Sequence, residues 1–83
     1  MAEVIVYTTE PCSYCSRVKM LLSKRGIAYK EINLARDADG RSALAERTGM
    51  LSFPQVVVDG ELIGGFDQTV AADRAGRLAA LAA

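Results

Sequence analysis

Two cysteines, Cys12 and Cys15, lie in the stretch YTTEPCSYC and are the only cysteines among the 83 residues. Two thiols at this spacing can form a disulfide and open it again, which is the chemistry of thiol–disulfide exchange. A structural zinc site is not expected, because it needs four ligands and the chain has no histidine. A permanent structural disulfide is not expected either, because so short a loop adds little stability. The remaining alternative is that both thiols only pack inside the fold.

The cysteines are expected at the start of a helix. Apolar residues recur at helical spacing over residues 13–25 and a glycine follows, while residues 3–7 form a β-branched strand just before. A helix N-terminus presents N–H groups and partial positive charge, and both lower the pKa of a nearby thiol. Cys12, at the cap, is therefore expected to be the exposed nucleophile, and Cys15, one turn later, the resolving thiol. No histidine is needed for this activation.

The remaining chain alternates between strand and helix patterns. Residues 27–34 alternate apolar and polar residues, as in a strand with one solvated face, and residues 40–47 form a helix that a glycine closes. Two short β runs flank Asp59-Gly60, a strong hairpin pattern, and the alanine-rich tail is helical with a break near Gly76. The order β-α-β-α-β-β-α predicts an α/β fold with a four-stranded mixed sheet flanked by helices. Its first two strands should be parallel.

Two further motifs could form a binding site. In SFPQVVV, residues 52–58, Pro54 cannot donate to a strand ladder and is therefore expected at the strand's first residue. In IGGFDQ, residues 63–68, two glycines let the backbone pass close to a ligand. The N–H groups of Phe66 and Asp67 open the next helix and could hold a carboxylate. The alternative is an ordinary turn with Asp67 as the N-cap.

The composition excludes several classes of partner. Ten basic and ten acidic residues cancel, and the pI is about 6.2, so no nucleic acid or anionic membrane is expected. The chain is 51% hydrophobic and is expected to be one domain over residues 1–83, acting as a monomer. No segment reaches the roughly 20 apolar residues of a membrane span, and MAEVIVYTTE lacks the pattern of a signal peptide. A cytoplasmic location is therefore expected, where a reducing environment disfavours permanent disulfides.

Taken together, YTTEPCSYC, SFPQVVVDG and IGGFDQ resemble the motifs of the glutaredoxin family in order and spacing, over essentially the whole chain. The resemblance implies a dithiol glutaredoxin of the C-S-Y-C type with a thioredoxin-like fold. It implies an enzyme that uses glutathione as co-substrate and reduces protein disulfides and protein–glutathione mixed disulfides.

The resemblance also implies roles for residues. Cys12 and Cys15 would be catalytic. The glutathione-binding residues would be Tyr14, Phe53, Pro54, Gly65, Phe66 and Asp67. Tyr14 would line the site, and Phe53, before a cis peptide bond to Pro54, would pair its backbone with the glutathione cysteine. The turn at Phe66 and Asp67 would hold the γ-glutamyl end.

Three positions depart from the family pattern. Thr9 stands where glutaredoxins usually carry a lysine that binds a glutathione carboxylate, and Arg41 and Arg47 are the candidates to replace it. Ser13 replaces the commoner proline between the cysteines, and Phe53 replaces a valine. The missing lysine concerns the affinity for glutathione. Ser13 favours the binding of an iron–sulfur cluster, and Phe53 keeps its backbone role but enlarges the apolar surface beside the site.

Two other functions stay open. One is a redoxin that a flavoprotein reductase reduces and that ignores glutathione; the threonine at position 9 favours it mildly. The other is a carrier in which two subunits share a [2Fe–2S] cluster, held by Cys12 of each subunit and two glutathiones. Lys19, one turn beyond Cys15, is expected either to add positive potential at the thiols or to be a solvated helix charge.

Overall fold

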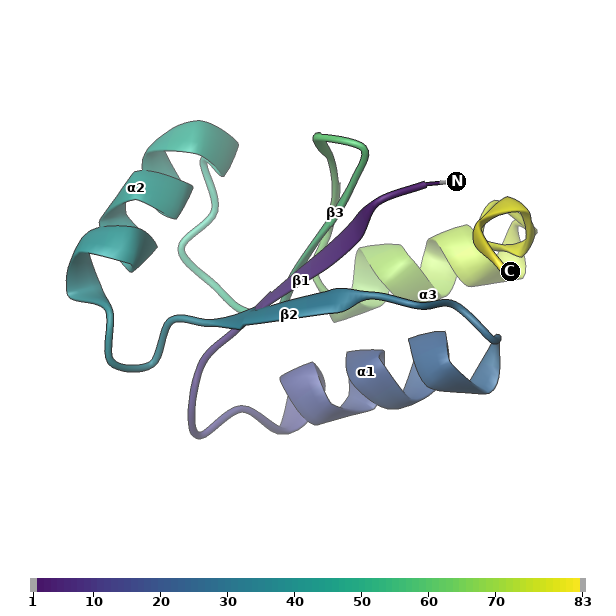
Figure 1. Ribbon diagram of the computed structural model, residues 1–83, viewed down its shortest axis with the longest axis horizontal. Helices are drawn as coiled ribbons and strands as arrows, with labels where there is room; N and C mark the ends of the chain where they lie inside the picture. The colour runs from purple at the N-terminus through teal and green to yellow at the C-terminus, as the bar shows by residue number, and fades with distance from the viewer. Residues whose placement is uncertain (1, 83) are drawn as a thin grey trace.

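Four short strands build a mixed sheet in the computed structural model, which describes residues 2–82 (Figure 1). The strands lie in the order β2-β1-β3-β4. β1 pairs with β2 in parallel and with β3 antiparallel, and β3 pairs antiparallel with β4. The strands are β1 (Val4–Thr8), β2 (Lys30–Asn33), β3 (Gln55–Val58) and β4 (Glu61–Gly64).

Three α-helices cover the sheet and confirm the predicted order β-α-β-α-β-β-α. The helices are α1 (Ser13–Lys24), α2 (Ala38–Thr48) and α3 (Phe66–Arg74), and a short 3₁₀ helix (Ala79–Leu81) follows. α1 and α3 lie on one face of the sheet, and α2 lies on the other (Figure 1). Within residues 2–82, no helix is long and apolar enough to cross a bilayer.

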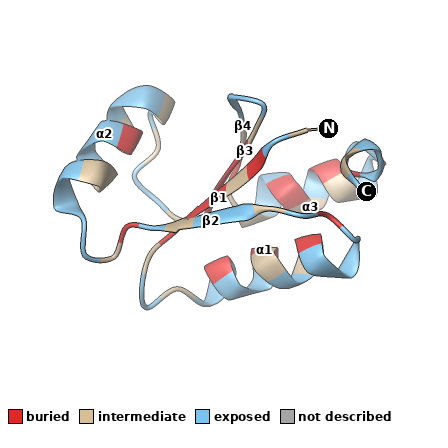
Figure 2. Cartoon of the chain, viewed as in Figure 1, coloured by how far each residue is buried: buried red, intermediate tan, exposed pale blue. Residues whose placement is uncertain are grey.

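Alternation along the strands divides the core into two halves, since successive side chains of a strand point to opposite faces. The half under α1 and α3 contains Val4, Val6, Val18, Leu22, Ile27, Val56, Ala72 and Leu78. The half under α2 contains Tyr7, Leu34, Leu44 and Val57. Figure 2 shows these buried positions along the strands and the inward sides of the helices. The larger half fixes α1, and therefore the cysteines at its start, against the sheet.

Two element boundaries differ from the prediction. β2 spans only Lys30–Asn33 instead of residues 27–34, because Ile27 is buried in the core just after α1 rather than paired in the sheet. α2 begins at Ala38, two residues before the predicted start. The carboxylate of Asp37 accepts a hydrogen bond from the Gly40 N–H at 2.8 Å and so caps the first turn.

The predicted hairpin turn is confirmed. Asp59 and Gly60 both have positive φ, 50° and 81°, as a two-residue type I′ turn between antiparallel strands requires. The Asp59 carboxylate also accepts a hydrogen bond from the Glu3 N–H at 2.8 Å. The predicted break in the tail is confirmed as well: α3 ends at Arg74 and Gly76 has φ of 76°.

Candidate active site

Cys12 and Cys15 form a disulfide at the N-terminus of α1. Cys12 is the N-cap residue with extended backbone (φ −155°, ψ 98°), and its Sγ accepts a hydrogen bond from the Cys15 N–H at 3.1 Å. This N–H is one of those that a helix leaves without an intrahelical partner at its start. The Cys12 sulfur therefore lies where the helix end stabilises negative charge, as the sequence predicts.

The two sulfurs differ in their access to solvent. Cys15 is buried, with 3% of its surface exposed, whereas Cys12 is half-buried. An incoming disulfide can therefore reach Cys12 more readily than Cys15.

A pocket of about 330 Å³ lies beside Tyr14, between the start of α1 and the start of α3. It is lined by Tyr14, Met50, Ser52, Phe53, Pro54, Gly65, Phe66, Asp67 and Gln68. All six residues that the family resemblance assigns to glutathione binding are among them. We refer to this cavity as the Tyr14 pocket. The structure thus brings together three motifs that are spread along the sequence from Tyr14 to Gln68.

One wall of the Tyr14 pocket is the segment before β3. The Phe53–Pro54 peptide bond is cis, as the resemblance implies, and the Glu10–Pro11 bond is cis as well. Pro54 is buried and directly precedes β3, whereas the prediction made it the first residue of the strand. Phe53 therefore lies outside the ladder of β3, where its backbone borders the pocket.

Gln55 supports this wall from inside the fold and was not identified from the sequence. It is fully buried, and its Nε2 donates to the carbonyl oxygens of Met50 at 3.1 Å and Ser52 at 3.0 Å. Its Oε1 has no hydrogen-bond partner among residues 2–82. A polar residue in the apolar run PQVVV was the pattern that could have drawn attention to it.

The opposite wall is the turn that opens α3. Gly65 is the N-cap, so the alternative in which Asp67 caps this helix is wrong; Asp67 lies exposed in the first turn. Gln68 closes the turn, because its Oε1 accepts a hydrogen bond from the Gly65 N–H at 2.9 Å. Gly64 has φ of 129°, and a Cβ there would meet the Gln68 Cβ at 2.8 Å. Glycine is therefore required at position 64 because the backbone passes close to the Gln68 side chain, whereas the sequence suggested a close approach to a ligand.

A second pocket, of about 520 Å³, lies on the other side of the cysteines and is lined in part by Thr9, Cys12 and Cys15. A chain of polar groups borders it. The buried Thr8 hydroxyl donates to a Glu31 oxygen at 2.8 Å, and the Lys19 ammonium pairs with the same carboxylate at 3.1 Å. The Thr8 hydrogen bond is the main cause that lowers the pKa of Glu31; burial acts in the opposite direction, and Lys19 lowers it further.

The cations considered from the sequence are placed away from the Tyr14 pocket. Lys19 lies in the second pocket and is paired with Glu31, so neither expectation for it holds fully: it borders the thiols, but its charge is compensated. Arg41 donates from Nη1 to the carbonyl oxygens of Leu34 and Ala35, which ties it to the loop before α2. Arg47 is exposed and does not line the pocket, and Thr9 lies on the other side of the cysteines.

Aromatic side chains connect the Tyr14 pocket to the surface of α1. The Tyr14 ring is 51% exposed, and its centroid lies 5.5 Å from that of Phe66. The Arg17 guanidinium lies over the Tyr14 ring, 5.2 Å from its centroid. This distance is within the range of a cation–π contact.

Sequence comparison identifies relatives over most of the chain. The sequence model described as Glutaredoxin matches residues 4–63. Glutaredoxin 3 of Escherichia coli strain K12 is 40% identical over 78 residues, which cover 94% of this chain and 94% of that protein.

Solved structures agree in fold. The crystal structure of the buckwheat glutaredoxin–glutathione complex has a TM-score of 0.87 at 33% identity, covering 99% of this chain and 83% of that one. The holo form of glutaredoxin C1 from Populus tremula × tremuloides has a TM-score of 0.86 at 40% identity, covering 96% and 75%. The predicted thioredoxin-like fold is confirmed. The chain therefore belongs to the glutaredoxin family, and its cysteine pair is that of a thiol–disulfide oxidoreductase.

Proposed function

We propose that this protein is a glutathione-dependent oxidoreductase that reduces protein disulfides and protein–glutathione mixed disulfides. Cys12 is the nucleophile and Cys15 the resolving thiol. One observation supports glutathione above all: the six residues assigned to its binding line a single pocket. One of them, Tyr14, follows Cys12 by two positions in the sequence. The volume of the pocket, about 330 Å³, is within the range of small-molecule sites.

In this proposal the walls of the Tyr14 pocket hold the two ends of the tripeptide. The backbone of Phe53 pairs with the glutathione cysteine, and Tyr14 packs beside it. The N–H groups at Phe66 and Asp67 are at a helix start, where a carboxylate is favoured. The Asp67 carboxylate is exposed in the same turn and pairs with the ammonium group of the γ-glutamyl end.

Reduction of a mixed disulfide takes two exchange steps. The Cys12 thiolate attacks the glutathione sulfur, the Cys12–glutathione disulfide forms, and the protein cysteine leaves as a thiolate that takes up a proton. A glutathione thiolate then attacks the glutathione sulfur on Cys12, which releases oxidised glutathione and restores the Cys12 thiolate. In sum, one mixed disulfide and one glutathione become one protein thiol and one oxidised glutathione.

Reduction of a protein disulfide uses both cysteines. Cys12 attacks one substrate sulfur, and Cys15 then attacks Cys12, which releases the substrate as a dithiol and leaves the Cys12–Cys15 disulfide. This oxidised form is the one that the structure contains. Two glutathiones return it to the dithiol and leave as oxidised glutathione. The protein is proposed to act as one domain, as a monomer, in a reducing cytoplasm that supplies glutathione.

Turnover of a small glutathione mixed disulfide tests the proposal. With glutathione, glutathione reductase and NADPH present, the protein should drive NADPH oxidation, and the Cys12→Ser variant should not. If reduction needed a flavoprotein reductase and proceeded without glutathione, the redoxin alternative would replace this proposal. Equal rates with and without the protein under both conditions, glutathione or a flavoprotein reductase as the reductant, would contradict both.

The cluster-carrier alternative requires more than one copy of the chain. A [2Fe–2S] cluster takes four ligands, usually thiolates, and within residues 2–82 no group of three or more histidine, cysteine or acidic side chains is gathered. The ligands of one chain therefore do not fit the cluster. Reconstitution with iron, sulfide and glutathione distinguishes the cases: a brown dimer would support the carrier, and a colourless monomer would leave the oxidoreductase.

A further inference from the structure

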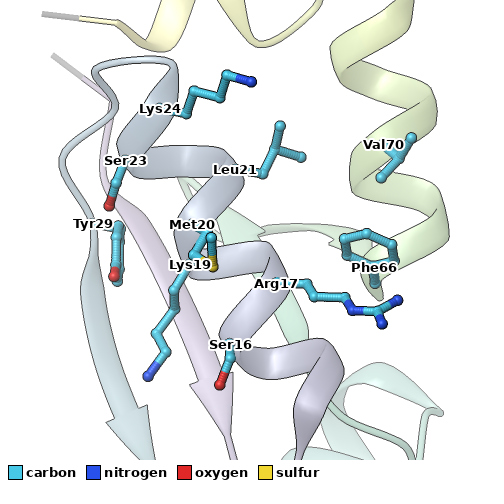
Figure 3. Close-up of a pocket in the computed structure, with 10 residues that line it drawn as sticks. All are labelled: Ser16, Arg17, Lys19, Met20, Leu21, Ser23, Lys24, Tyr29, Phe66 and Val70. Atoms are coloured by element: carbon cyan, nitrogen blue, oxygen red, sulfur yellow. The ribbon is translucent and has the colours of Figure 1, made fainter.

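A third hollow lies along α1, next to the two pockets at the cysteines. It measures about 670 Å³. Its apolar part is formed by Met20, Leu21, Tyr29, Phe66 and Val70. Figure 3 shows Phe66 and Val70 of α3 on one side of α1, Tyr29 on the other, and Met20 between them. We call this surface the α1 groove.

The α1 groove exposes one apolar side chain that belongs to neither half of the core. Met20 is 71% exposed, although an apolar residue in the middle of a helix is usually turned inward. Phe66 lines both the α1 groove and the Tyr14 pocket, so the two surfaces are continuous. A polypeptide whose cysteine reaches Cys12 therefore has an apolar surface directly beside it.

The charged residues that line the α1 groove are all basic. Arg17, Lys19 and Lys24 line it, and none of its lining residues is acidic, although acidic and basic residues are equal in number over the whole chain. Lys19 is compensated by Glu31. Among residues 2–82, neither Arg17 nor Lys24 forms an ion pair. The Arg17 guanidinium lies over the Tyr14 ring, so Lys24 is the cation that remains for a partner.

We propose that the α1 groove docks an acidic, apolar segment of the protein whose disulfide or mixed disulfide is reduced at Cys12. This inference rests on the proposed function and adds the chemical class of its protein substrates. The helix geometry predicts the spacing. Met20 follows Cys12 by eight residues and Lys24 by twelve, about 12 Å and 18 Å along α1. An extended segment spans these distances in about four and about six residues.

Glutathionylated peptides test the proposal. The probe peptide carries a central glutathionylated cysteine, leucine four positions away and aspartate six positions away, on both sides. In two matched peptides, lysine replaces the aspartate or serine replaces the leucine. The wild-type protein should reduce the probe about three- to tenfold faster, by kcat/KM, than the lysine peptide at low ionic strength, the range expected for one or two exposed charge pairs.

Variants of two exposed residues locate the effect. Lys24→Glu should remove or reverse the preference for the acidic peptide, and this loss should shrink with added salt. Met20→Ser should lower kcat/KM for the leucine peptides at every salt concentration, because burial of apolar surface is not screened. The matched control is Lys30→Glu, because Lys30 is an exposed lysine on the edge strand β2. It should change neither the preference for the acidic peptide nor kcat/KM for the leucine peptides. All three variants should turn over a small glutathione mixed disulfide normally.

Equal rates for the acidic and basic peptides would contradict docking in the α1 groove and leave the proposed function intact. Equal effects of Lys24→Glu and Lys30→Glu would do the same. A direct measurement covers the case in which no glutathionylated substrate is reduced. The probe peptide with serine in place of its cysteine should shift the NMR signals of the Met20 and Val70 methyl groups. The lysine peptide should not, and an absence of shifts with the acidic peptide would overturn the inference.

Discussion

At the scale of single residues, the two cysteines have unequal surroundings although they are three positions apart. Cys12 is half-buried at the helix cap and accepts the Cys15 N–H at 3.1 Å, whereas Cys15 is buried one turn later. The helix end favours negative charge at Cys12, and burial shields Cys15 from external thiols. Different roles for the two thiols follow from these positions.

Exchange of each cysteine for serine should separate the roles. Cys12→Ser should abolish both reactions, because no nucleophile remains at the cap. Cys15→Ser should keep much of the activity on glutathione mixed disulfides, since free glutathione resolves the Cys12 intermediate, and should lose the reduction of protein disulfides. The coupled glutathione reductase assay measures the first reaction, and turbidity of reduced insulin measures the second. Equal loss in both variants would contradict the assignment.

Thr8 and Glu31 predict a pH dependence of stability. The Thr8 hydroxyl lowers the pKa of Glu31 in the folded protein. A lowered pKa adds stability that is present above the unfolded value, about 4.3 for glutamate, and is lost as the pH falls through the folded value. The difference in stability between wild type and Thr8→Val should therefore be largest above about pH 4.3 and should shrink at lower pH.

Urea unfolding between about pH 3 and pH 7 measures this difference. The matched control is Thr48→Val, since the Thr48 hydroxyl donates to the carbonyl oxygen of Leu44 at 3.0 Å, a group that does not titrate. Thr48→Val should lower the free energy of unfolding by the same amount at every pH. If the Thr8→Val curve ran parallel to the control, the hydroxyl would not act through Glu31.

At the scale of elements, the start of β3 and the start of α3 form the two walls of the Tyr14 pocket. A glutamine stabilises each wall. The buried Gln55 side chain donates hydrogen bonds to the carbonyl oxygens of Met50 and Ser52, and the Gln68 side chain accepts a hydrogen bond from the Gly65 N–H. Position and shape of the pocket therefore depend on polar groups that do not themselves carry out the reaction.

Gln55→Leu should impair glutathione binding more than it impairs the chemistry. The substitution keeps a similar volume but leaves two loop carbonyl oxygens without their donor, at a cost of about 1–3 kcal/mol in the free energy of unfolding. Because Met50 and Ser52 line the pocket, KM for glutathione should rise several-fold while kcat changes little. Steady-state kinetics measures the split. A loss of kcat at unchanged KM would show that Gln55 does not position the wall.

At the scale of the whole molecule, the segment after α3 completes the core under α1. Leu78 is 2% exposed and belongs to the same buried cluster as Val18 and Leu22 of α1. Arg25, just after α1, pairs with Asp73 of α3 through two hydrogen bonds of 2.9 Å. The end of the chain thus stabilises the helix that carries the cysteines.

Leu78→Ala should lower the free energy of unfolding by about 2–5 kcal/mol, the range for truncating a buried leucine. Leu51→Ala is the matched control, because Leu51 is 85% exposed and the same truncation there should stay within about 0.5 kcal/mol. The free energy of unfolding of both variants is measured by urea unfolding. Both proteins are kept oxidised, so that the Cys12–Cys15 disulfide is the same in each. Similar losses at both positions would contradict the role of Leu78 in the core.

The sequence by itself determined the element order, the hairpin turn and the location of the cysteines at a helix start. These features depend on local physics: the period of apolar residues, the positive φ of an Asp-Gly turn, and the N–H groups at a helix end. The start of α2 was misplaced because the Asp37 carboxylate caps it from outside the periodic segment. The extent of β2 was overestimated because an alternating pattern does not tell whether Ile27 pairs in a sheet or packs beneath it.

Only the tertiary structure decided how the site is assembled. The walls of the Tyr14 pocket meet because β3 pairs with β1 and α3 packs beside α1, contacts between residues far apart in sequence. Three interactions depend on those contacts: the hydrogen bonds of the buried Gln55 amide, the ion pair of Lys19 with Glu31, and the hydrogen bonds that Arg41 donates to backbone carbonyl oxygens. A sequence pattern shows which groups can carry charge or donate hydrogen bonds. Which partner each group finds depends on distances that only the folded chain establishes.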